Sequence, residues 1–498
     1  MGKLTDKVAK GVFWVLMEKF GIQLAHFVVT LVLARLLTPN DYGTVALLSI
    51  FISIANVLVD CGFGKALVQK KEASQTDYNT VFYLSMAFAA ALYAGLFFSA
   101  PLVARFYDIP DLKIMLRVLA LSLIFHSING VQNVELNRKM LFHLSFRISW
   151  VRTIVSAVTG ISFACAGYGP WALVWASLFG GIAGVIARQL VIRWRPSLTF
   201  SWESAKGLFR FGWKMAVAGL VNAVCNNITG LVIGKVYTRA DLAFYKKGDH
   251  TPHILTNSLD ATLGRVSFPA LVRLQDEPVK LRNALRRMIK CSTFLVFPMM
   301  AAVVVLAKPL VLAMFGKQWL PCVPYMQLYC IACACRPFST VNLQTILAMG
   351  NSGTYLVLIV IRRVLGLATL ALTIRFGVLQ YLLWAVIISG PVGVLINAIP
   401  NWRLLGYTWL MQFRDILPAL LMSSVAWAVV FAAGCAWPFR VEWFLAVGVP
   451  LGFAFYFALA LAFRSAPLAE FAQQLLKHTG RMPALGRILA AISRRCGK

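Results

Sequence analysis

Apolar stretches long enough to cross a lipid bilayer follow one another along the chain. A transmembrane helix needs about 20 consecutive, mostly apolar residues to cross a hydrocarbon core of about 30 Å. Windows of this kind predict about fourteen spans between residues 11 and 463. Only 13% of the 498 residues are charged and 59% are hydrophobic, whereas about one-quarter of a soluble domain is charged. The sequence therefore predicts an all-α polytopic membrane protein.

Two segments in different halves of the chain share a pattern of polar residues. The first is LARLLTPNDYG at 33–43, and the second is IGKVYTRADLA at 233–243. A single ungapped register matches charged residues at both ends of the span that follows each segment. The matched pairs are Arg35 with Lys235, Asp41 with Asp241, Asp60 with Asp260, and Lys65 with Arg265. Similarity at a fixed offset indicates an internal duplication.

The duplication predicts how the spans are arranged. An even number of predicted spans separates the two copies, so both copies insert with the same orientation. Parallel repeats are related by an axis along the membrane normal. We expect two six-helix lobes, residues 1–200 and 201–406, around a central cavity, then two helices in 407–464 and a basic amphipathic cytoplasmic tail, 465–498. This architecture is typical of alternating-access transporters.

The net charge of +30, from 48 basic and 18 acidic residues, fits a membrane chain. Cytoplasmic loops collect Lys and Arg, and the anionic headgroups of membrane lipids attract them. Because the basic residues are spread between apolar spans, they do not form a surface for nucleic acid. Their distribution places both termini in the cytoplasm when a weak eighth span at 249–274 is retained.

Polar residues follow one face of each leading span of the two repeats, spans one, two, seven and eight. The faces comprise Lys19, Gln23, His26 and Thr30; Ser49, Ser53, Asn56 and Asp60; Asn222, Asn226 and Thr229; and His253, Asn257, Asp260 and Gly264. Polar groups are costly in hydrocarbon, so these faces should meet protein or water. Interhelical hydrogen bonds explain each face alone, whereas equivalent faces in related spans indicate a shared hydrophilic cavity.

Basic residues outnumber acidic residues in this predicted cavity. An electropositive, partly desolvated cavity suits an anionic substrate such as a diphosphate, which Arg and Lys hold by charge-assisted hydrogen bonds. The expected substrate-binding residues are Lys19, Gln23, His26, Asn56, Lys65, Asn222, Asn226 and Arg265. The expected gating or ion-coupling residues are Arg35, Asp41, Asp60, Lys235, Asp241 and Asp260. The Arg35–Asp41 and Lys235–Asp241 pairs have a second interpretation, as salt bridges that close the loop of each helix hairpin.

The sequence indicates neither a cofactor nor a metal site. The cysteine cluster of Cys330, Cys333 and Cys335 has separations that do not bring three thiolates to one face of a helix. These cysteines are interpreted as small residues that pack a helix interface. The sequence contains no phosphate-binding GxxxxGK[ST] loop, so direct use of ATP is not expected.

The segment at 33–71, from LARLLTPNDYG to CGFGKALVQKK, resembles the opening of bacterial polysaccharide repeat-unit flippases. These belong to the multidrug/oligosaccharidyl-lipid/polysaccharide (MOP) exporter superfamily. The likeness continues through GYGPWALVW, IGKVYTRADLAFYKKGD and LAMGNSG, over roughly residues 5 to 405. Where that family usually reads lGlYsrA, this chain has LAFYKKG at 242–248. We expect Lys246 and Lys247 of that segment at the outer mouth of the cavity.

The resemblance implies a specific role. It implies about fourteen helices, both termini in the cytoplasm and a cationic central cavity. It also implies movement of an undecaprenyl-diphosphate-linked oligosaccharide from the inner to the outer leaflet of the bacterial plasma membrane, for O-antigen (lipopolysaccharide), capsule or exopolysaccharide assembly. A polysaccharide polymerase and a chain-length regulator are the protein partners that it implies.

Two other functions remain open at this point. A cation-coupled drug antiporter of the same superfamily would need unpaired acidic residues within the lobes and a less basic cavity. A membrane-embedded polysaccharide polymerase would need outer acidic residues for acid–base chemistry, and Asp108 and Asp111 are the only close pair in the expected outer loops. The driving force is also open, with Asp60, Asp260 or His26 as candidate proton carriers.

Overall fold

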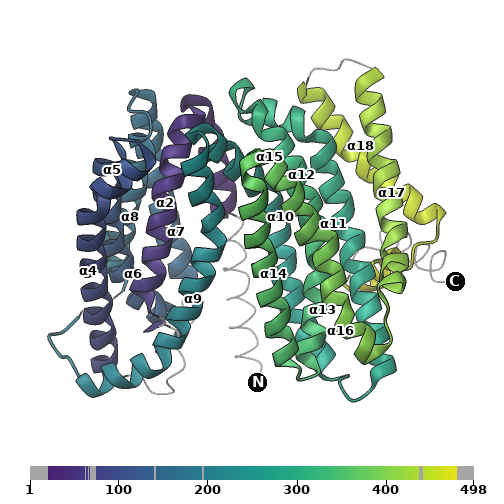
Figure 1. Cartoon of the computed structure of the whole chain (residues 1–498), viewed down its shortest axis with the longest axis horizontal. Helices are drawn as coiled ribbons and strands as arrows, with labels where there is room; N and C mark the ends of the chain where they lie inside the picture. The colour runs from purple at the N-terminus through teal and green to yellow at the C-terminus, as the bar shows by residue number, and fades with distance from the viewer. Residues whose placement is uncertain are drawn as a thin grey trace. The chain divides into compact units, whose positions relative to one another are not determined.

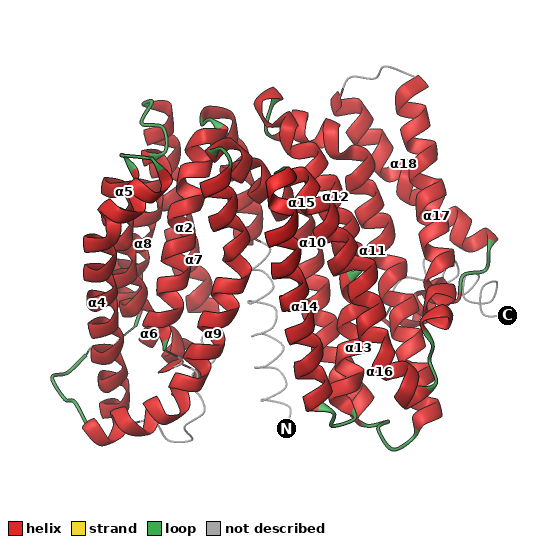
Figure 2. Cartoon of the chain, viewed as in Figure 1, coloured by secondary structure: helices red, strands yellow, loops and turns green. Residues whose placement is uncertain are grey.

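The computed structural model describes residues 21–61, 63–64, 67, 74–138, 142–192, 196–436 and 441–478. These residues form helices joined by short turns, without a strand among them (Figure 2). Eleven helices in the described ranges are long and apolar enough to cross a membrane, and Gly21–Leu36 is a shorter apolar helix. The predicted all-α, multi-pass membrane fold is therefore confirmed. The expected count of about fourteen spans is compatible with these helices.

The chain divides into two compact units, Met1–Ala243 and Phe244–Lys498. The helices of the first unit, labelled in Figure 1, are α2 (Pro39–Asp60), α4 (Gln75–Tyr107), α5 (Leu112–Ala120), α6 (Ser122–Arg138), α7 (Phe142–Cys165), α8 (Trp171–Val191) and α9 (Trp202–Val236). Helix α10 (Arg239–Val272) begins in the first unit and continues in the second.

The second unit contains the remaining elements. They are α11 (Pro278–Met314), η1 (Lys317–Cys322), α12 (Val323–Ala334), α13 (Arg336–Ala348), α14 (Ser352–Thr373), η2 (Ile374–Phe376), α15 (Val378–Ile387), η3 (Ile388–Val392), α16 (Gly393–Leu405), α17 (Trp409–Ala436), α18 (Val441–Ala462) and α19 (Ala466–His478). Segment 249–274, the weak eighth span of the sequence prediction, is helical as far as Val272.

The repeated T-x-x-D motif starts a helix in both copies. At α2, the Thr38 backbone N–H donates to Asp41 Oδ2 at 2.9 Å, and the Asp41 N–H donates to Thr38 Oγ1 at 3.3 Å. At α10, Thr238 and Asp241 form the same two bonds, each 3.1 Å long. Each motif is a capping box, which satisfies backbone donors that the first turn of a helix leaves unpaired. The spacing of Thr and Asp therefore has a local structural cause.

Helix α9 packs against α2 and α4 within the first unit. The Tyr107 hydroxyl donates to the Leu231 carbonyl oxygen at 3.3 Å, and Asn227 Nδ2 donates to Ser53 Oγ at 3.3 Å. Gly234 allows the close approach, because an added Cβ would overlap the Leu47 side chain. These contacts group α9 with the first unit, whereas the repeat pattern assigns residues 201–406 to the C-terminal lobe. The lobe boundary at 200/201 stays a prediction.

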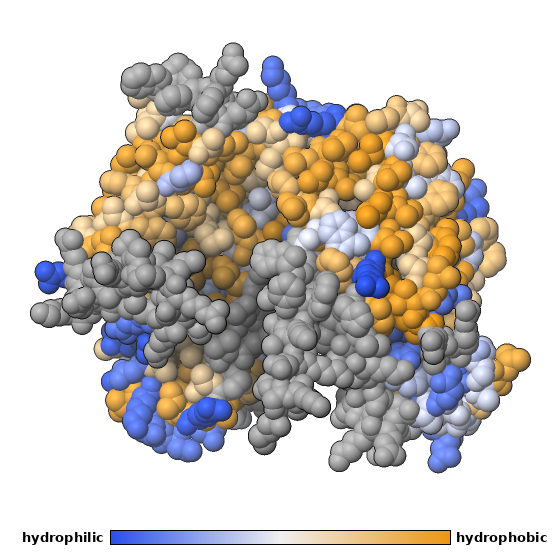
Figure 3. Space-filling model, turned by 180° about the vertical axis from the view of Figure 1, so that it is seen from behind, coloured by the Kyte–Doolittle hydropathy of each residue, from blue (hydrophilic) through white to orange (hydrophobic). Residues whose placement is uncertain are grey.

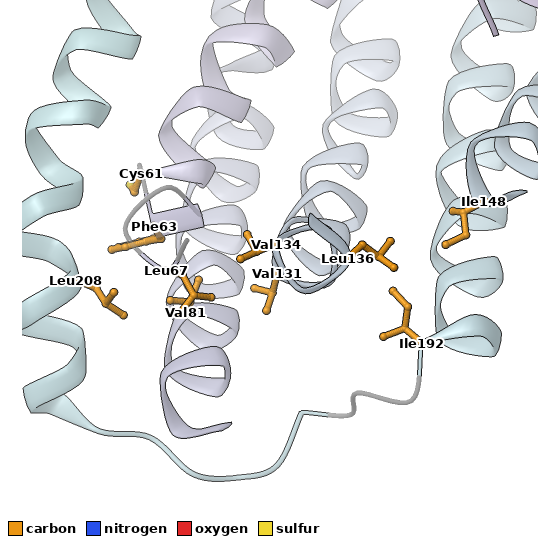
Figure 4. Close-up of a cluster of buried hydrophobic side chains, with 10 residues drawn as sticks. All are labelled: Cys61, Phe63, Leu67, Val81, Val131, Val134, Leu136, Ile148, Ile192 and Leu208. Carbon is orange, nitrogen blue, oxygen red and sulfur yellow. The ribbon is translucent and has the colours of Figure 1, made fainter. Parts of the chain in front are cut away.

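An apolar cluster holds one end of the first unit together (Figure 4). Its buried members are Cys61, Phe63, Leu67, Val81, Val131, Val134, Leu136, Ile148, Ile192 and Leu208. Buried polar contacts fix the linker between α8 and α9 beside it: Asn79 Nδ2 lies 2.6 Å from both Ser197 Oγ and Thr199 Oγ1. Hydrophobic burial and satisfied buried amides together position the start of α9.

Apolar side chains also cover much of the molecular surface, as Figure 3 shows for one face. Leu190, Phe98 and Leu372 are among the large apolar residues that remain exposed. Contiguous exposed apolar areas of this kind mark surfaces that meet another apolar phase. Together with the helix lengths, they fit helices whose outer faces contact lipid.

Candidate functional site

Three arginine side chains line one cavity inside the second unit. The cavity has a volume of about 580 Å³ and is lined by residues of α10, α12, α13, α14, α15 and η3. Arg336 comes from the first turn of α13, and Arg362 and Arg363 are adjacent in the middle of α14. A volume of about 300–1,000 Å³ is usual for a ligand site. No acidic residue is among the described residues that line this cavity.

Local breaks in the helices bring these arginines to the cavity. Helix α12 ends before Arg336, and Pro337 occupies the first turn of α13, where its missing N–H is tolerated. Across the cavity, the π-helical segment η3 contains Ser389, whose carbonyl oxygen accepts a long hydrogen bond of 3.5 Å from Arg362 Nη2. Single π-helical turns are frequent at functional sites.

An acidic and basic network extends from the cavity wall into α10. Arg336 Nε lies 2.9 Å from Asp260 Oδ2, and Arg336 Nη1 contacts His253 Nδ1. His253 Nε2 lies 2.8 Å from Asp249 Oδ1. The Asp260 side chain is 12% exposed, and neither carboxylate oxygen receives a well-directed hydrogen bond from a described residue. Arg336 and Asp260 therefore form a close ion pair at the cavity wall.

A second polar cavity, of about 500 Å³, lies within the first unit. His26, one of the predicted substrate-binding residues, lines it together with Arg152 of α7 and Tyr42 of α2. Most of its other polar lining groups are serine and threonine hydroxyls of helices 21–36, α7 and α8.

Among the other predicted substrate-binding residues in the described part of the chain, Asn222 and Asn226 are in contact with each other. Lys19 and Lys65 lie outside the described residues, and so does the side chain of Arg265. Gln23 is exposed on helix 21–36, and Asn56 is half-buried on α2. On α9, the exposed Asn226 donates to Asn222 Oδ1 at 3.4 Å.

The predicted gating residues have defined neighbours. Asp41 and Asp241 cap α2 and α10, as described above, and Arg35 is exposed at the end of helix 21–36. Lys235 donates to the Phe106 carbonyl oxygen and lies 3.1 Å from Asp108 Oδ2. Asp60 Oδ1 lies 3.1 Å from His126 Nε2, and Asp260 pairs with Arg336.

Lys247, which we expected at the outer mouth of the cavity, is buried within the second unit. Its Nζ atom lies 4.4 Å from the ring centroid of Phe315 and 5.2 Å from that of Trp319. Cation–π contacts of this kind stabilise a desolvated ammonium group. One of the two lysines in segment 242–248 therefore has a structural role, since it packs against aromatic rings.

Five polar residues of these sites were not predicted from the sequence: Arg336, Arg362, Arg363, Arg152 and His126. For the α14 pair a signal was available, because two adjacent arginines interrupt an apolar stretch of membrane-spanning length. An ionisable residue within a membrane span is a candidate functional residue on energetic grounds. The partners of Asp60 and Asp260 were not readable, because they come from helices distant in sequence.

The fold and the arginine-lined cavity define a polytopic helical membrane protein with an electropositive chamber in its second unit. Solved structures show the same fold. The lipid II flippase MurJ in an inward-closed conformation superposes with a TM-score of 0.70 over 91% of this chain and 98% of that chain, at 14% identity. An inward-facing multidrug resistance MATE family transporter of the MOP superfamily superposes with a TM-score of 0.58 over 82% and 95% of the two chains, also at 14% identity.

Sequence comparison gives the family. The family model described as "Polysaccharide biosynthesis protein" matches residues 32–324, and the chain belongs to this family. The teichuronic acid biosynthesis protein TuaB of Bacillus subtilis is 24% identical, over 92% of this chain and 96% of its own length. The succinoglycan biosynthesis transport protein ExoT of Rhizobium meliloti is 23% identical over 83% and 82% of the two chains. The resemblance noted from the sequence is thereby confirmed.

Proposed function

We propose that this chain is a flippase that moves an undecaprenyl-diphosphate-linked oligosaccharide across the bacterial inner membrane by alternating access. The observation that carries the proposal is the arginine-lined cavity of about 580 Å³ within the second unit. Membership of a polysaccharide biosynthesis family and the fold shared with MOP-superfamily transporters support the same role.

The chemistry of the cavity suits a diphosphate. A guanidinium group offers donors in a planar fork that matches two phosphate oxygens, and each charge-assisted bond is stronger than a neutral one. Arg336, Arg362 and Arg363 carry three positive charges around one space. Helix walls of low polarity strengthen the attraction relative to water. A diphosphate with two or more negative charges is a ligand of matching charge.

Binding of the diphosphate would exchange the partner of Arg336. In the described structure Arg336 faces Asp260 at 2.9 Å while it also lines the cavity. A phosphate oxygen competes for the same guanidinium, so Asp260 and His253 serve as positioning residues that hold Arg336 in place before the substrate arrives. In this proposal, Asp260 fulfils its predicted ion-coupling role through its contact with Arg336.

The remaining predicted residues belong to the same proposal. In the first unit, Gln23, His26, Asn56, Asn222 and Asn226 are proposed substrate contacts. Lys19, Lys65 and Arg265 are proposed contacts whose side chains lie outside the described part of the chain. We place both termini in the cytoplasm and propose a polysaccharide polymerase and a chain-length regulator as partners at the membrane.

A leaflet-sidedness assay in reconstituted vesicles tests this function. Lipid-linked oligosaccharide is placed in one leaflet, and its appearance in the other leaflet is followed with a membrane-impermeant probe. We expect Arg362→Gln with Arg363→Gln to slow translocation by about tenfold or more, since one charge-assisted bond is worth about 1.5–3 kcal/mol. Arg375→Gln is the matched control, because Arg375 is exposed just after α14 and does not line the cavity. Wild-type rates in the double variant would refute the assigned cavity.

The same vesicles separate the alternative functions. A drug antiporter would transport an organic cation, which the three arginines repel. A polymerase would lengthen the glycan without moving lipid, and it would need outer acidic groups for proton transfer. Of the two candidate acids, Asp108 already pairs with Lys235 at 3.1 Å. Translocation without elongation and without cation uptake is the expected result.

A further inference from the structure

The cavity of the first unit is lined by a different set of side chains from the arginine-lined cavity of the second unit. Its volume is about 500 Å³, and its ionisable lining residues in the described part of the chain are Arg152, His26 and Tyr42. Five hydroxyl side chains accompany them. They are Thr30 on helix 21–36; Ser149, Thr153 and Ser156 on α7; and Ser177 on α8. The cavity therefore combines one guanidinium with a dense set of groups that both donate and accept hydrogen bonds.

Helix geometry creates this polar wall. On α7, Ser149, Arg152, Thr153 and Ser156 follow the i, i+3, i+4, i+7 spacing, which places them on one face of the helix. The facing helix α8 contributes small residues that allow close packing. A Cβ added to Gly180 would lie 2.8 Å from Ser156 Cβ, so glycine is required there. The wall is thus a continuous feature of two tightly packed helices.

A polar wall of this kind is expensive in a membrane helix. Segment Leu144–Cys165 of α7 is apolar and long enough to span the bilayer, and Arg152 lies well inside it. An arginine near the centre of a span costs about 2.5–3.5 kcal/mol on insertion scales. The aliphatic stem of Arg152 packs over Gly184 of α8, where an added Cβ would lie 3.6 Å from Arg152 Cδ, and the same side chain lines the cavity. A bound anion would offset the cost of placing its guanidinium group there.

Charge and hydrogen-bonding capacity select the ligand class. One guanidinium fork matches one carboxylate, whereas the three arginines of the other cavity match a diphosphate. Hydroxyl side chains complement a ligand that carries several hydroxyl groups of its own. We propose that the first-unit cavity is a subsite for a carboxylate-bearing sugar of the transported glycan, with Arg152 on the carboxylate and the serine and threonine hydroxyls on the ring. This assignment rests on the proposed flippase function and adds a substrate class to it.

The test is direct binding of a soluble probe to the full-length protein in lipid nanodiscs. Sodium glucuronate is the probe, with glucose and inorganic phosphate as comparison ligands, and saturation-transfer NMR or calorimetry is the readout. We expect glucuronate to bind more tightly than either comparison ligand. Arg152→Gln is expected to weaken glucuronate binding by about tenfold or more and to leave glucose binding unchanged.

Two further variants serve as controls for the effect of Arg152 on glucuronate binding. Arg147→Gln removes an exposed arginine of the same helix that does not line the cavity, so it should leave glucuronate binding unchanged. Ser177→Ala, which removes one lining hydroxyl without adding bulk, should weaken glucose and glucuronate binding alike. An unaltered unfolding temperature shows that each variant is folded, and Arg152→Lys serves as the test variant if Arg152→Gln is not folded, with a smaller loss expected.

Several outcomes would overturn the subsite. They are equal binding of glucose and glucuronate, equal binding of phosphate and glucuronate, or Arg152 variants that bind glucuronate like the wild type. The vesicle assay separates the two proposals. Translocation that depends on Arg362 and Arg363 without glucuronate binding rejects the subsite alone. Arg152-dependent glucuronate binding without translocation rejects the flippase function and leaves a sugar-acid site.

Discussion

Asp415 should be one of the most costly single residues to remove from the second unit. Its side chain is 5% exposed and accepts hydrogen bonds from Arg286 Nε at 2.7 Å and Arg286 Nη2 at 2.9 Å. Lys290 Nζ lies 3.0 Å away, and the Tyr407 hydroxyl donates at 2.7 Å. One carboxylate on α17 thus joins two basic residues of α11 to the turn that precedes α17.

The expected loss of stability on removing Asp415 follows from the interactions that its partners lose. Breaking a buried ion pair by removing one member costs about 3–5 kcal/mol. Arg286 and Lys290 are 41% and 35% exposed, so water partly replaces the lost carboxylate and the lower end applies, about 3 kcal/mol. For a unit of this size, 1 kcal/mol shifts the unfolding temperature by about 2–4 °C. Asp415→Ala should therefore lower it by about 6–12 °C, and Tyr407→Phe, which removes one charge-assisted bond at the lower end of its range, about 1.5 kcal/mol, by about 3–6 °C.

Thermal unfolding of the purified protein in detergent or nanodiscs, followed by intrinsic fluorescence, measures these shifts. Glu277→Gln is the control at the start of α11, because Glu277, the residue before this helix, pairs with Lys280 and their side chains are 51% and 67% exposed. Exposed pairs contribute about 0–1 kcal/mol, so its effect should be small. If Asp415→Ala shifted the unfolding temperature no more than Glu277→Gln, the buried network would not stabilise the second unit.

Three further predictions test the fold in the same assay. Gly43→Ala should lower the unfolding temperature by several degrees, because the new Cβ would overlap the Arg239 carbonyl oxygen, whereas Gly95→Ala, which meets nothing within 4 Å, should not; equal shifts would contradict this packing. Thr238→Ala removes the cap of α10 and should cost about 1 kcal/mol; an unchanged midpoint would mean that the cap contributes nothing. Asn342→Ala should cost about 1–3 kcal/mol, because it removes a hydrogen-bond partner from each of two buried amide side chains, those of Gln412 and Asn401; a neutral result would mean that their remaining partners suffice.

The sequence predicted best what depends on near neighbours in the chain. The apolar windows predicted the helices, because the requirement for a span is local. The match between Thr38–Asp41 and Thr238–Asp241 was also informative, since a capping box needs only four consecutive residues. The weak segment 249–274 was retained through the distribution of basic residues, and it is helical as far as Val272.

The candidate site was harder to predict, because its contacts join distant segments. Asp260 was singled out from the repeat, but its partner Arg336 lies outside the repeated positions. Arg362 and Arg152 lie outside the leading pair of spans in each repeat, although each interrupts an apolar helix. The burial of Lys247 against Phe315 and Trp319 depends on tertiary packing that hydropathy does not encode.

The position of a bound diphosphate tests the central claim most directly. Electron cryomicroscopy of the full-length protein with undecaprenyl diphosphate would locate the two phosphorus atoms. The proposed function predicts phosphate oxygens about 2.7–2.9 Å from guanidinium nitrogens of Arg336, Arg362 or Arg363, with Arg336 withdrawn from Asp260. A diphosphate bound elsewhere, with Arg336 still paired to Asp260 and the cavity free of ligand, would contradict it.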